Sequence, residues 1–146
     1  FVKIGIGNDH HGVDVKKRII EHLKKRNIDY IDYGTNTKDN VDYIKYARIV
    51  CNAILNKECD LGILICGTGI GMSIVANKFD GIRCGKVNTV EEAKLTKEHN
   101  MSNVMALSEK ISNLDEVLDT FIDTKYSNEE RHIRRVEEIM EVEQNG

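Results

Sequence analysis

The residues best suited to chemistry lie in one stretch, residues 60–77, with the sequence DLGILICGTGIGMSIVAN. Residues 61–65 form an apolar run that predicts a buried strand of a parallel sheet. Cys66 ends this run, glycines follow at positions 67, 69 and 71, and residues 72–77 fit a helix. A strand, a glycine-rich turn and a helix direct backbone N–H groups towards an anion. A thiolate at Cys66 would be stabilised by the same helix N-terminus, so the stretch predicts an anion cradle with a nucleophile or base at its edge.

This glycine pattern differs from two common nucleotide-binding motifs. Lys78 lies too far along the chain for a Walker loop, and no Ser or Thr follows it. The third glycine comes two residues after the second, whereas the dinucleotide fingerprint needs a spacing of three. A structural alternative therefore stays open, in which the stretch is a tight turn and Cys66 is a buried core thiol.

Length and composition narrow the class of protein. The 146 residues suffice for one domain with a proper core, and the net charge of −3 argues against a nucleic-acid partner. No apolar run approaches the ~20 residues that span a membrane, and the chain opens directly as a strand, so we expect no signal peptide. The four cysteines lack CxxC spacing, so we expect no zinc or other metal site but reduced thiols in a cytoplasmic protein.

Hydrophobic periodicity predicts alternating strands and helices over the whole chain. Expected strands cover residues 2–8, 28–33, 61–65, 82–87 and 103–107. Expected helices cover residues 13–26, a segment from about 43 to 55, residues 72–77, a segment from Thr89 to about His99, residues 114–124, and residues 128–143 after a cap at Ser127 or Asn128. This order predicts one α/β domain with a five-stranded parallel sheet covered on both faces.

Polar residues follow several of these strands. Asp9 and His10 come after the first strand, Cys66 and Thr68 after the third, and Asn100 lies one loop away. Ligands of open parallel sheets bind beyond the carboxyl ends of the strands. These residues are therefore candidates for a common site.

Six segments of the chain resemble ribose-5-phosphate isomerase B and its sugar-phosphate isomerase relatives. They are GNDHHG at 7–12, VDY at 41–43, ILICGTGIGMSIVANK at 63–78, GIR at 81–83, EHN at 98–100 and RHIRRVE at 131–137. The resemblance implies a three-layer α/β/α sandwich with a Rossmann-like sheet. It also implies a homodimer, with a tetramer as the alternative, whose active sites lie at the subunit interface. The implied reaction is the interconversion of ribose 5-phosphate and ribulose 5-phosphate without metal or cofactor.

The resemblance also implies roles in proton transfer. The carbonyl moves from C1 to C2 through an enediolate, so a base and stabilisers of an oxyanion are both needed. Cys66 is the implied base, and Thr68 is implied to bond the reacting oxygens, with a turn hydroxyl as its structural alternative. The implied cradle consists of the backbone N–H groups of Gly67, Gly69, Ile70 and Gly71.

Ring opening comes before isomerisation, because the sugar is mostly cyclic in water. His99 is the implied acid for this step, since an imidazole exchanges a proton near neutral pH. Asp9 and His10 are implied to form the opposite wall of the site. A histidine at a helix end is otherwise often only a partner of the helix dipole, which is the alternative for His99.

The phosphate is implied to bind to the C-terminal helix. Arg131 and Arg135 lie four residues apart and so share a helix face, although a solvated charged helix is the alternative. Lys110 stands where the family has an assisting arginine, and Asn100 and Tyr43 are implied to bond the sugar. Three positions depart from the family: Ile44 replaces a proline, Met101 replaces an aspartate, and His11 replaces a small residue. We assign His11 no role.

Two other functions stay open at this point. The first is isomerisation of a hexose 6-phosphate such as galactose or allose 6-phosphate, because pocket depth sets substrate length. The second is a non-catalytic module that binds an anion or a nucleotide. Asp9, Cys66, His99 and both arginines stand in one chain, which favours a self-sufficient enzyme over a two-chain assembly.

Overall fold

A five-stranded parallel sheet forms the centre of the computed structural model, which describes residues 1–146. Its strands are β1 (Lys3–Asn8), β2 (Asp29–Asp32), β3 (Leu61–Cys66), β4 (Cys84–Lys86) and β5 (Val104–Ser108). They lie side by side in the order β2-β1-β3-β5-β4, and every pairing is parallel. The predicted number and direction of strands is confirmed.

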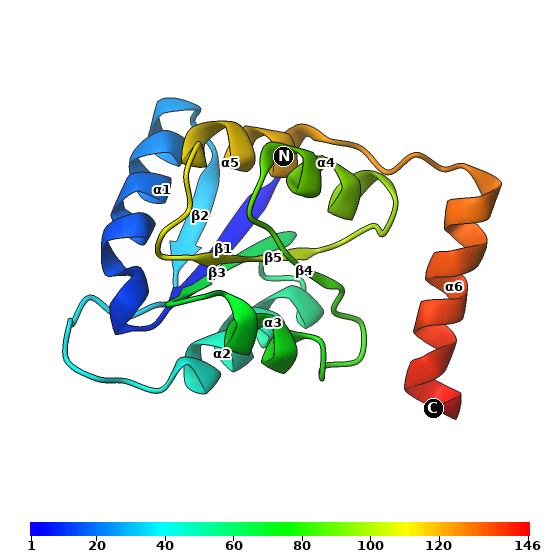
Figure 1. Cartoon of the computed structure of the whole chain (residues 1–146), viewed down its shortest axis with the longest axis horizontal. Coiled ribbons are helices and arrows are strands. Elements are labelled where there is room, and N and C mark those ends of the chain that lie inside the picture. Colours follow the sequence, from blue (N-terminus) through cyan, green and yellow to red (C-terminus); the bar gives the residue numbers. More distant parts are fainter.

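Helices cover both faces of this sheet (Figure 1). The first face carries α1 (Val13–Lys25), α4 (Val90–Glu98) and α5 (Leu114–Asp123), and the second carries α2 (Tyr43–Leu55) and α3 (Ile70–Ala76). A short 3-10 helix, η1 (His10–Gly12), joins β1 to α1. The predicted three-layer α/β/α sandwich is therefore confirmed.

Alternation along β3 explains why both faces of the sheet are covered. Ile63 and Ile65 pack in the core cluster on the α1 and α5 side, whereas Leu64 and Cys66 pack in the cluster with α2 and α3. All four residues are at most 5% exposed. Since successive side chains of a strand point to opposite faces, a run of apolar residues is stable only between two helical layers.

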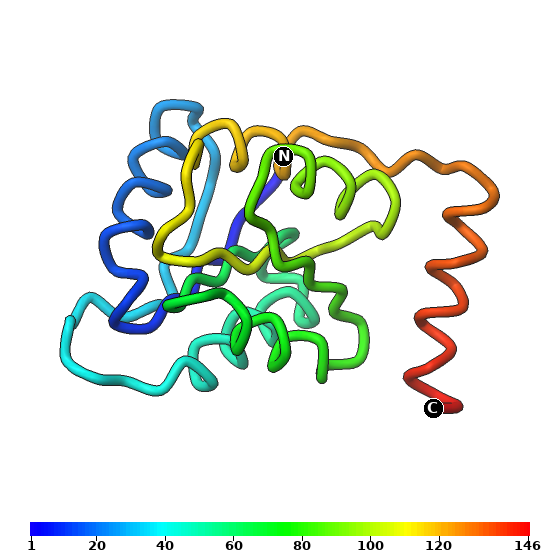
Figure 2. Tube along the Cα trace, viewed as in Figure 1, coloured from blue at the N-terminus to red at the C-terminus, as the bar shows by residue number.

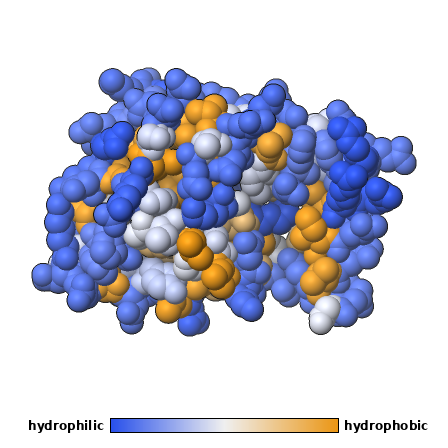
Figure 3. Space-filling view, in the orientation of Figure 1, coloured by the Kyte–Doolittle hydropathy of each residue, from blue (hydrophilic) through white to orange (hydrophobic).

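The C-terminal helix α6 (Glu130–Asn145) stands apart from the three layers, as the backbone trace shows (Figure 2). It touches the body through the carboxylate of Glu143, which accepts from the amide of Gly81 at 2.7 Å, and through a contact of Arg83 with Met140. Ile133, Ile139 and Val142 of α6 are exposed, and Figure 3 shows hydrophobic side chains along the side of α6 facing the body and over α3. This much exposed apolar surface on one helix is typical of an interaction surface.

The start of α6 differs from the prediction. The helix begins at Glu130 rather than 128, runs to Asn145, and has no side-chain cap. Asn128 adopts a left-handed backbone with φ of 56°, whereas a capping residue needs an extended one. The Ser127 hydroxyl contacts the His132 ring and accepts from the Glu129 amide. The predicted cap at Ser127 or Asn128 is therefore wrong.

Two other elements begin two residues away from the expected position. β4 is limited to Cys84–Lys86, because Ile82 closes a turn by donating its amide to the carbonyl of Phe79. α3 begins at Ile70 rather than 72, so the glycine-rich turn is already part of its first turn. The predicted cap of α4 is confirmed, since the Thr89 hydroxyl accepts from the Glu92 amide. No helix combines the length and apolar character needed to cross a membrane.

Candidate active site

A cavity of about 590 Å³ opens where β1 and β3 end. These two strands are neighbours, with Asn8 opposite Ile65, so the residues that follow them meet at one edge of the sheet. The chain leaves β1 and β3 towards opposite faces here, which makes this edge the switch point where ligands of such sheets bind. The cavity is lined by Asp9, His10, His11, Val41, Tyr43, Cys66, Gly67, Thr68, Ile70, Gly71 and Ile74.

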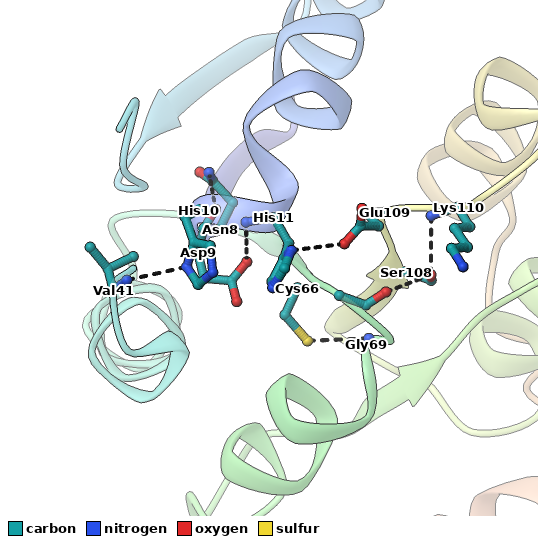
Figure 4. Close-up of polar contacts among 11 residues, drawn as sticks. Asn8, Asp9, His10, His11, Val41, Cys66, Gly69, Ser108, Glu109 and Lys110 are labelled. Atoms are coloured by element: carbon teal, nitrogen blue, oxygen red, sulfur yellow. Dashed lines mark hydrogen bonds and ion pairs between the residues drawn. The ribbon is translucent and has the colours of Figure 1, made fainter. Parts of the chain in front are cut away.

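Cys66 lies at the floor of this cavity and is 5% exposed. Its sulfur accepts a hydrogen bond from the Gly69 amide at 3.2 Å (Figure 4). Gly69 has a φ of +80°, and a side chain there would press on the backbone of Leu107. The turn therefore requires glycine at this position in order to aim an N–H group at the thiol.

The first turn of α3 faces the same cavity. The amides of Gly71 and Met72 have no acceptor within the chain, as expected at the start of a helix. The Tyr43 ring lies against Gly71, where an added Cβ would come within 2.6 Å of it. Because Gly71 has no side chain, the Tyr43 ring can pack directly against the backbone of this turn.

Thr68 lines the cavity, and its hydroxyl accepts from the Ile70 amide at 3.1 Å. This bond is the one expected if Thr68 serves as a turn hydroxyl. It also leaves the hydroxyl proton free to donate into the cavity. Gly67 and Ile70 also line the cavity, whereas Gly69 contributes through its bond to Cys66.

Asp9 and His10 form the wall opposite the turn. Asp9 is 4% exposed, and its Oδ1 accepts from the amide of His11 at 2.9 Å, which leaves its second carboxylate oxygen without a partner in the chain. The Nδ1 atom of His10 accepts from the Val41 amide at 3.2 Å. A neutral His10 therefore carries its proton on Nε2, where it acts as a donor.

Two residues at this edge were not among the predicted site residues. His11 lines the cavity, and its Nδ1 lies 3.0 Å from Oε2 of Glu109, which follows β5 (Figure 4). The sequence held one usable signal, since Glu109 directly follows one strand of a parallel sheet and His11 lies three residues after another. Their pairing depends on strand order, which local patterns do not specify.

The other predicted site residues do not line this cavity. His99 caps the end of α4, and its ring lies 4.1 Å from that of His132 on α6. Asn100 lines a second cavity of about 430 Å³ between the body and α6. Lys110 is exposed, and only its amide has a bonding partner, the Ser108 hydroxyl at 3.1 Å.

Arg131 and Arg135 are exposed on α6, close to His132 and His99. Arg131 pairs with Glu129, and no ion pair joins two residues within α6, so the i,i+4 pairs typical of a purely solvated charged helix are absent. The pKa of His132 is lowered by burial and by the neighbouring charges of His99, Arg131 and Arg135, against a smaller opposite effect of Glu129. His99, His132 and the two arginines thus form a second polar cluster in the chain.

The remaining cysteines are separate from either cluster. Burial raises the pKa of Cys51 to about 12, and burial together with Cys51 raises that of Cys84 to about 12. Burial also raises the pKa of Cys59, and all four cysteines are free. These three pack against the core and have no place in the cavity at Cys66. No group of three or more His, Cys, Asp or Glu side chains has the arrangement of a metal site.

An all-parallel sheet with a thiol, a carboxylate and free amides at its switch point defines an α/β enzyme fold with a small-ligand site. A model of the family described as Ribose/Galactose Isomerase matches residues 4–139. The chain is 41% identical to ribose-5-phosphate isomerase B of Escherichia coli over 97% of each chain. The chain therefore belongs to the ribose/galactose isomerase family.

Solved structures agree with this assignment. Ribose-5-phosphate isomerase B of Clostridium thermocellum is 42% identical, with a TM-score of 0.93 over 98% of each chain. The enzyme of that name from Mycoplasma genitalium, solved with bound ribulose 5-phosphate, is 36% identical, with a TM-score of 0.91 over 99% of this chain and 97% of that one. The resemblance inferred from the motifs is confirmed.

Proposed function

We propose that this protein is a ribose-5-phosphate isomerase that interconverts ribose 5-phosphate and ribulose 5-phosphate. The observation that carries the proposal is the cavity in which the Cys66 thiol, the Asp9 carboxylate and the amides of the α3 turn face one space. The similarity to relatives named ribose-5-phosphate isomerase B supports the choice of substrate. The relative solved with ribulose 5-phosphate supports the choice of product.

In the proposed mechanism, Cys66 as a thiolate takes the proton from C2 of the open-chain aldose. The electron pair forms the C1–C2 double bond of an enediolate, and negative charge develops on O1. The amides of the α3 turn and the Thr68 hydroxyl donate to the enediolate oxygens. Cys66 then returns its proton to C1 while a proton passes from O2 to O1, which leaves the carbonyl at C2.

Ring opening precedes this transfer and needs an acid at the ring oxygen. We assign this role to His99, with Asp9 and the Nε2–H of His10 binding sugar hydroxyls from the opposite wall. The exposed position of His99 supports the assignment, since its ring is accessible to a ligand from outside the chain. Tyr43 and Asn100 are assigned to bonds with the sugar.

The phosphate requires cations, and the cavity at Cys66 is lined by no lysine or arginine. Arg131 and Arg135 on α6, with Lys110 assisting, are the proposed phosphate ligands. The cavity and the α6 cluster are separate within one chain, so we propose a homodimer in which a two-fold axis brings the α6 cluster of one subunit to the cavity of the other. The exposed apolar side chains of α3 and α6 support such an interface.

Two further assignments complete the proposal. The chain is one isomerase domain, with α6 as the arm that reaches the partner subunit. The enzyme works in the cytoplasm, which the four free cysteines support, since thiols stay reduced there.

The test is a direct assay of purified protein treated with EDTA. Ribulose 5-phosphate formation from ribose 5-phosphate is followed, with galactose 6-phosphate and allose 6-phosphate as comparison substrates. We expect rapid turnover of the pentose. Turnover of a hexose phosphate alone would identify the protein as a hexose 6-phosphate isomerase. Inactivity on all three sugars would favour the non-catalytic anion-binding module.

A further inference from the structure

Lys16 is a buried charged side chain that has no part in the proposed mechanism. It lies in α1 and is 1% exposed, whereas a lysine is almost never fully buried unless its charge is paired. Its Nζ atom donates to the carbonyl of Thr35 at 2.7 Å and to Oδ1 of Asn36 at 2.6 Å, and it lies 3.1 Å from Oδ2 of Asp32. Three acceptors match the three N–H donors of the ammonium group, so the buried charge is fully paired.

The three acceptors lie at the end of β2 and at the start of the β2–α2 loop, residues 33–42 (Figure 1). A second buried side chain holds the same point of this loop. Asn8 is 0% exposed, and its Nδ2 donates to the carbonyl of Thr35 at 3.0 Å. A side chain at Gly34 would collide with Asn8, so the loop passes very close to β1 at this position. Lys16 and Asn8 together fix the beginning of the loop to the body.

The other end of the β2–α2 loop reaches the cavity at Cys66. Val41 lines this cavity, and its amide donates to Nδ1 of His10 at 3.2 Å (Figure 4). Four of the five side chains at positions 36–40 are exposed, so burial of apolar groups does little to hold the loop. The polar contacts at its two ends therefore determine where the Val41 amide lies.

We propose that Lys16 is a positioning residue, which holds the β2–α2 loop so that the Val41 amide fixes the ring of His10. Lys16 lines no part of the cavity and acts through the loop alone. The inference rests on the proposed function for its effect on turnover, because His10 is assigned there to bind the sugar through Nε2–H. The contact of Val41 with Nδ1 keeps the proton of a neutral His10 on that Nε2 atom.

The first test compares the wild type with Lys16→Met, which keeps a side chain of similar length but removes the ammonium group. A small misplacement of a binding residue lowers activity by up to about 100-fold, so we expect kcat/KM for ribose 5-phosphate to fall by about 10- to 100-fold. The change should lie mainly in KM, because Cys66 and the amides of the α3 turn stay in place. Hydrogen exchange of the Val41 amide, followed by NMR, should become faster. A folded Lys16→Met protein with the KM of the wild type would overturn the proposal.

A double-mutant cycle shows whether Lys16 acts through His10. His10→Leu removes the ring that the Val41 amide holds, so Lys16→Met should add little to it. The KM of the double variant should therefore equal that of His10→Leu within about twofold. Independent effects would instead multiply. A KM raised by the product of the two single effects would show that Lys16 supports the fold in general, which would overturn the proposal.

A milder variant covers the case in which thermal melting shows that Lys16→Met is not folded. Asp32→Asn combined with Asn36→Ala weakens two of the three contacts of Lys16, and both substituted residues are exposed. We expect a smaller rise of KM than for Lys16→Met and faster exchange of the Val41 amide. Wild-type values of both quantities in this variant would overturn the proposal.

Lys38→Met is the matched control. Lys38 also joins the β2–α2 loop to α1, through an ion pair with Asp14 at 3.1 Å, but the two side chains are 67% and 71% exposed. Exposed pairs contribute little, so KM and the exchange of the Val41 amide should match the wild type. Changes equal to those of Lys16→Met would contradict the proposal.

The exchange measurement separates failure of this inference from failure of the proposed function. If wild-type protein turns over no sugar phosphate, the proposed function fails, but exchange of the Val41 amide still tests the loop. Faster exchange in Lys16→Met and not in Lys38→Met would support the anchoring role of Lys16. Unchanged exchange in a folded Lys16→Met protein would overturn it.

Discussion

Cys66 differs from the other three cysteines in what surrounds its sulfur. Cys51 and Cys84 lie among apolar groups, and burial raises the pKa of each thiol to about 12. Cys66 is 5% exposed, and its sulfur accepts a hydrogen bond from the Gly69 amide beside the cavity where β1 and β3 end. Among the four cysteines, only Cys66 accepts a hydrogen bond from a backbone amide, which makes it the candidate base or nucleophile.

The first prediction concerns this thiol. Cys66→Ala removes the proposed base while leaving the walls and the proposed phosphate ligands in place, so kcat should fall by about 10²- to 10⁴-fold with little change in KM. Steady-state kinetics on ribose 5-phosphate measure both quantities. Cys51→Ala is the control and should retain its kcat. If the Cys66→Ala enzyme keeps most of its turnover, Cys66 is not the base.

At the scale of elements, α6 makes few contacts with the rest of its own chain. Only His132 and Val136 of this helix are buried, while its isoleucines and arginines are exposed. A helix held by so few contacts gains stability chiefly from a further packing surface. The proposed function gives α6 two tasks, which are packing in the dimer and binding the phosphate.

The second prediction addresses the phosphate. Arg135→Ala removes a charge-assisted contact worth about 1.5–3 kcal/mol, so KM for ribose 5-phosphate should rise by roughly 10- to 150-fold with a smaller effect on kcat. Arg134→Ala, the neighbouring exposed arginine, is the control and should leave KM nearly unchanged. Equal KM values for the wild type and Arg135→Ala would show that Arg135 lies on a solvated charged surface and does not bind the phosphate.

The third prediction concerns the pH dependence of α6 packing. The folded pKa of His132 lies below its unfolded value of about 6.5, because burial and the nearby His99, Arg131 and Arg135 disfavour its charged form, with Glu129 opposing them. The unfolded state therefore binds more protons, and the stability contributed by neutral His132 is complete above about pH 6.5 and is lost as the pH falls towards its folded pKa.

This effect is measured by thermal melting between about pH 7.5 and 5, the range that brackets the ordinary histidine pKa. The melting temperature of the wild type should fall more steeply on acidification than that of His132→Asn, which has no imidazole to protonate. His22→Asn serves as a control for removing a histidine from another helix. Parallel slopes for the wild type and His132→Asn would contradict the assignment.

At the scale of the whole molecule, the single chain holds two polar clusters that do not meet. The cavity at Cys66 carries the proposed base and oxyanion donors, whereas His99, Arg131 and Arg135 lie around the junction of α4 and α6. In the proposed function, one active site needs both sets. The proposed two-fold dimer would provide two equivalent sites by pairing each cavity with the α6 cluster of its partner.

The fourth prediction tests this pairing by complementation. Cys66→Ala and Arg135→Ala homodimers should each be impaired, but a heterodimer of the two contains one intact site and one doubly defective site. Random exchange of subunits in an equal mixture should therefore restore about a quarter of the wild-type activity at substrate concentrations that are low for Arg135→Ala. The assay is made after co-unfolding and refolding, with each variant refolded alone as control. Activity that stays at the average of the two homodimers would show that each site is built within one chain.

The sequence by itself determined the sheet, the position of the glycine turn and the residues at the strand ends. These features depend on local patterns: an apolar run between helices forms a buried strand, and glycine spacing after it forms the turn that reaches Cys66. The same local logic placed Thr89 at the start of α4, where its hydroxyl accepts from the Glu92 amide. The six family-like segments extended the prediction to the family, which the comparisons confirmed.

Only the tertiary structure decided which of these residues meet. His11 and Glu109 pair because β1 and β5 flank β3, an order that no local pattern contains. Arg135 is separated from the cavity by the path of α6 away from the body, and His99 by its position at the end of α4. The start of α6 shifted because the Ser127 hydroxyl contacts the ring of His132, five residues further along the chain, and Asn128 has a left-handed backbone, so neither residue caps the helix. Contacts between distant segments depend on strand order and packing, and these are properties of the folded chain as a whole.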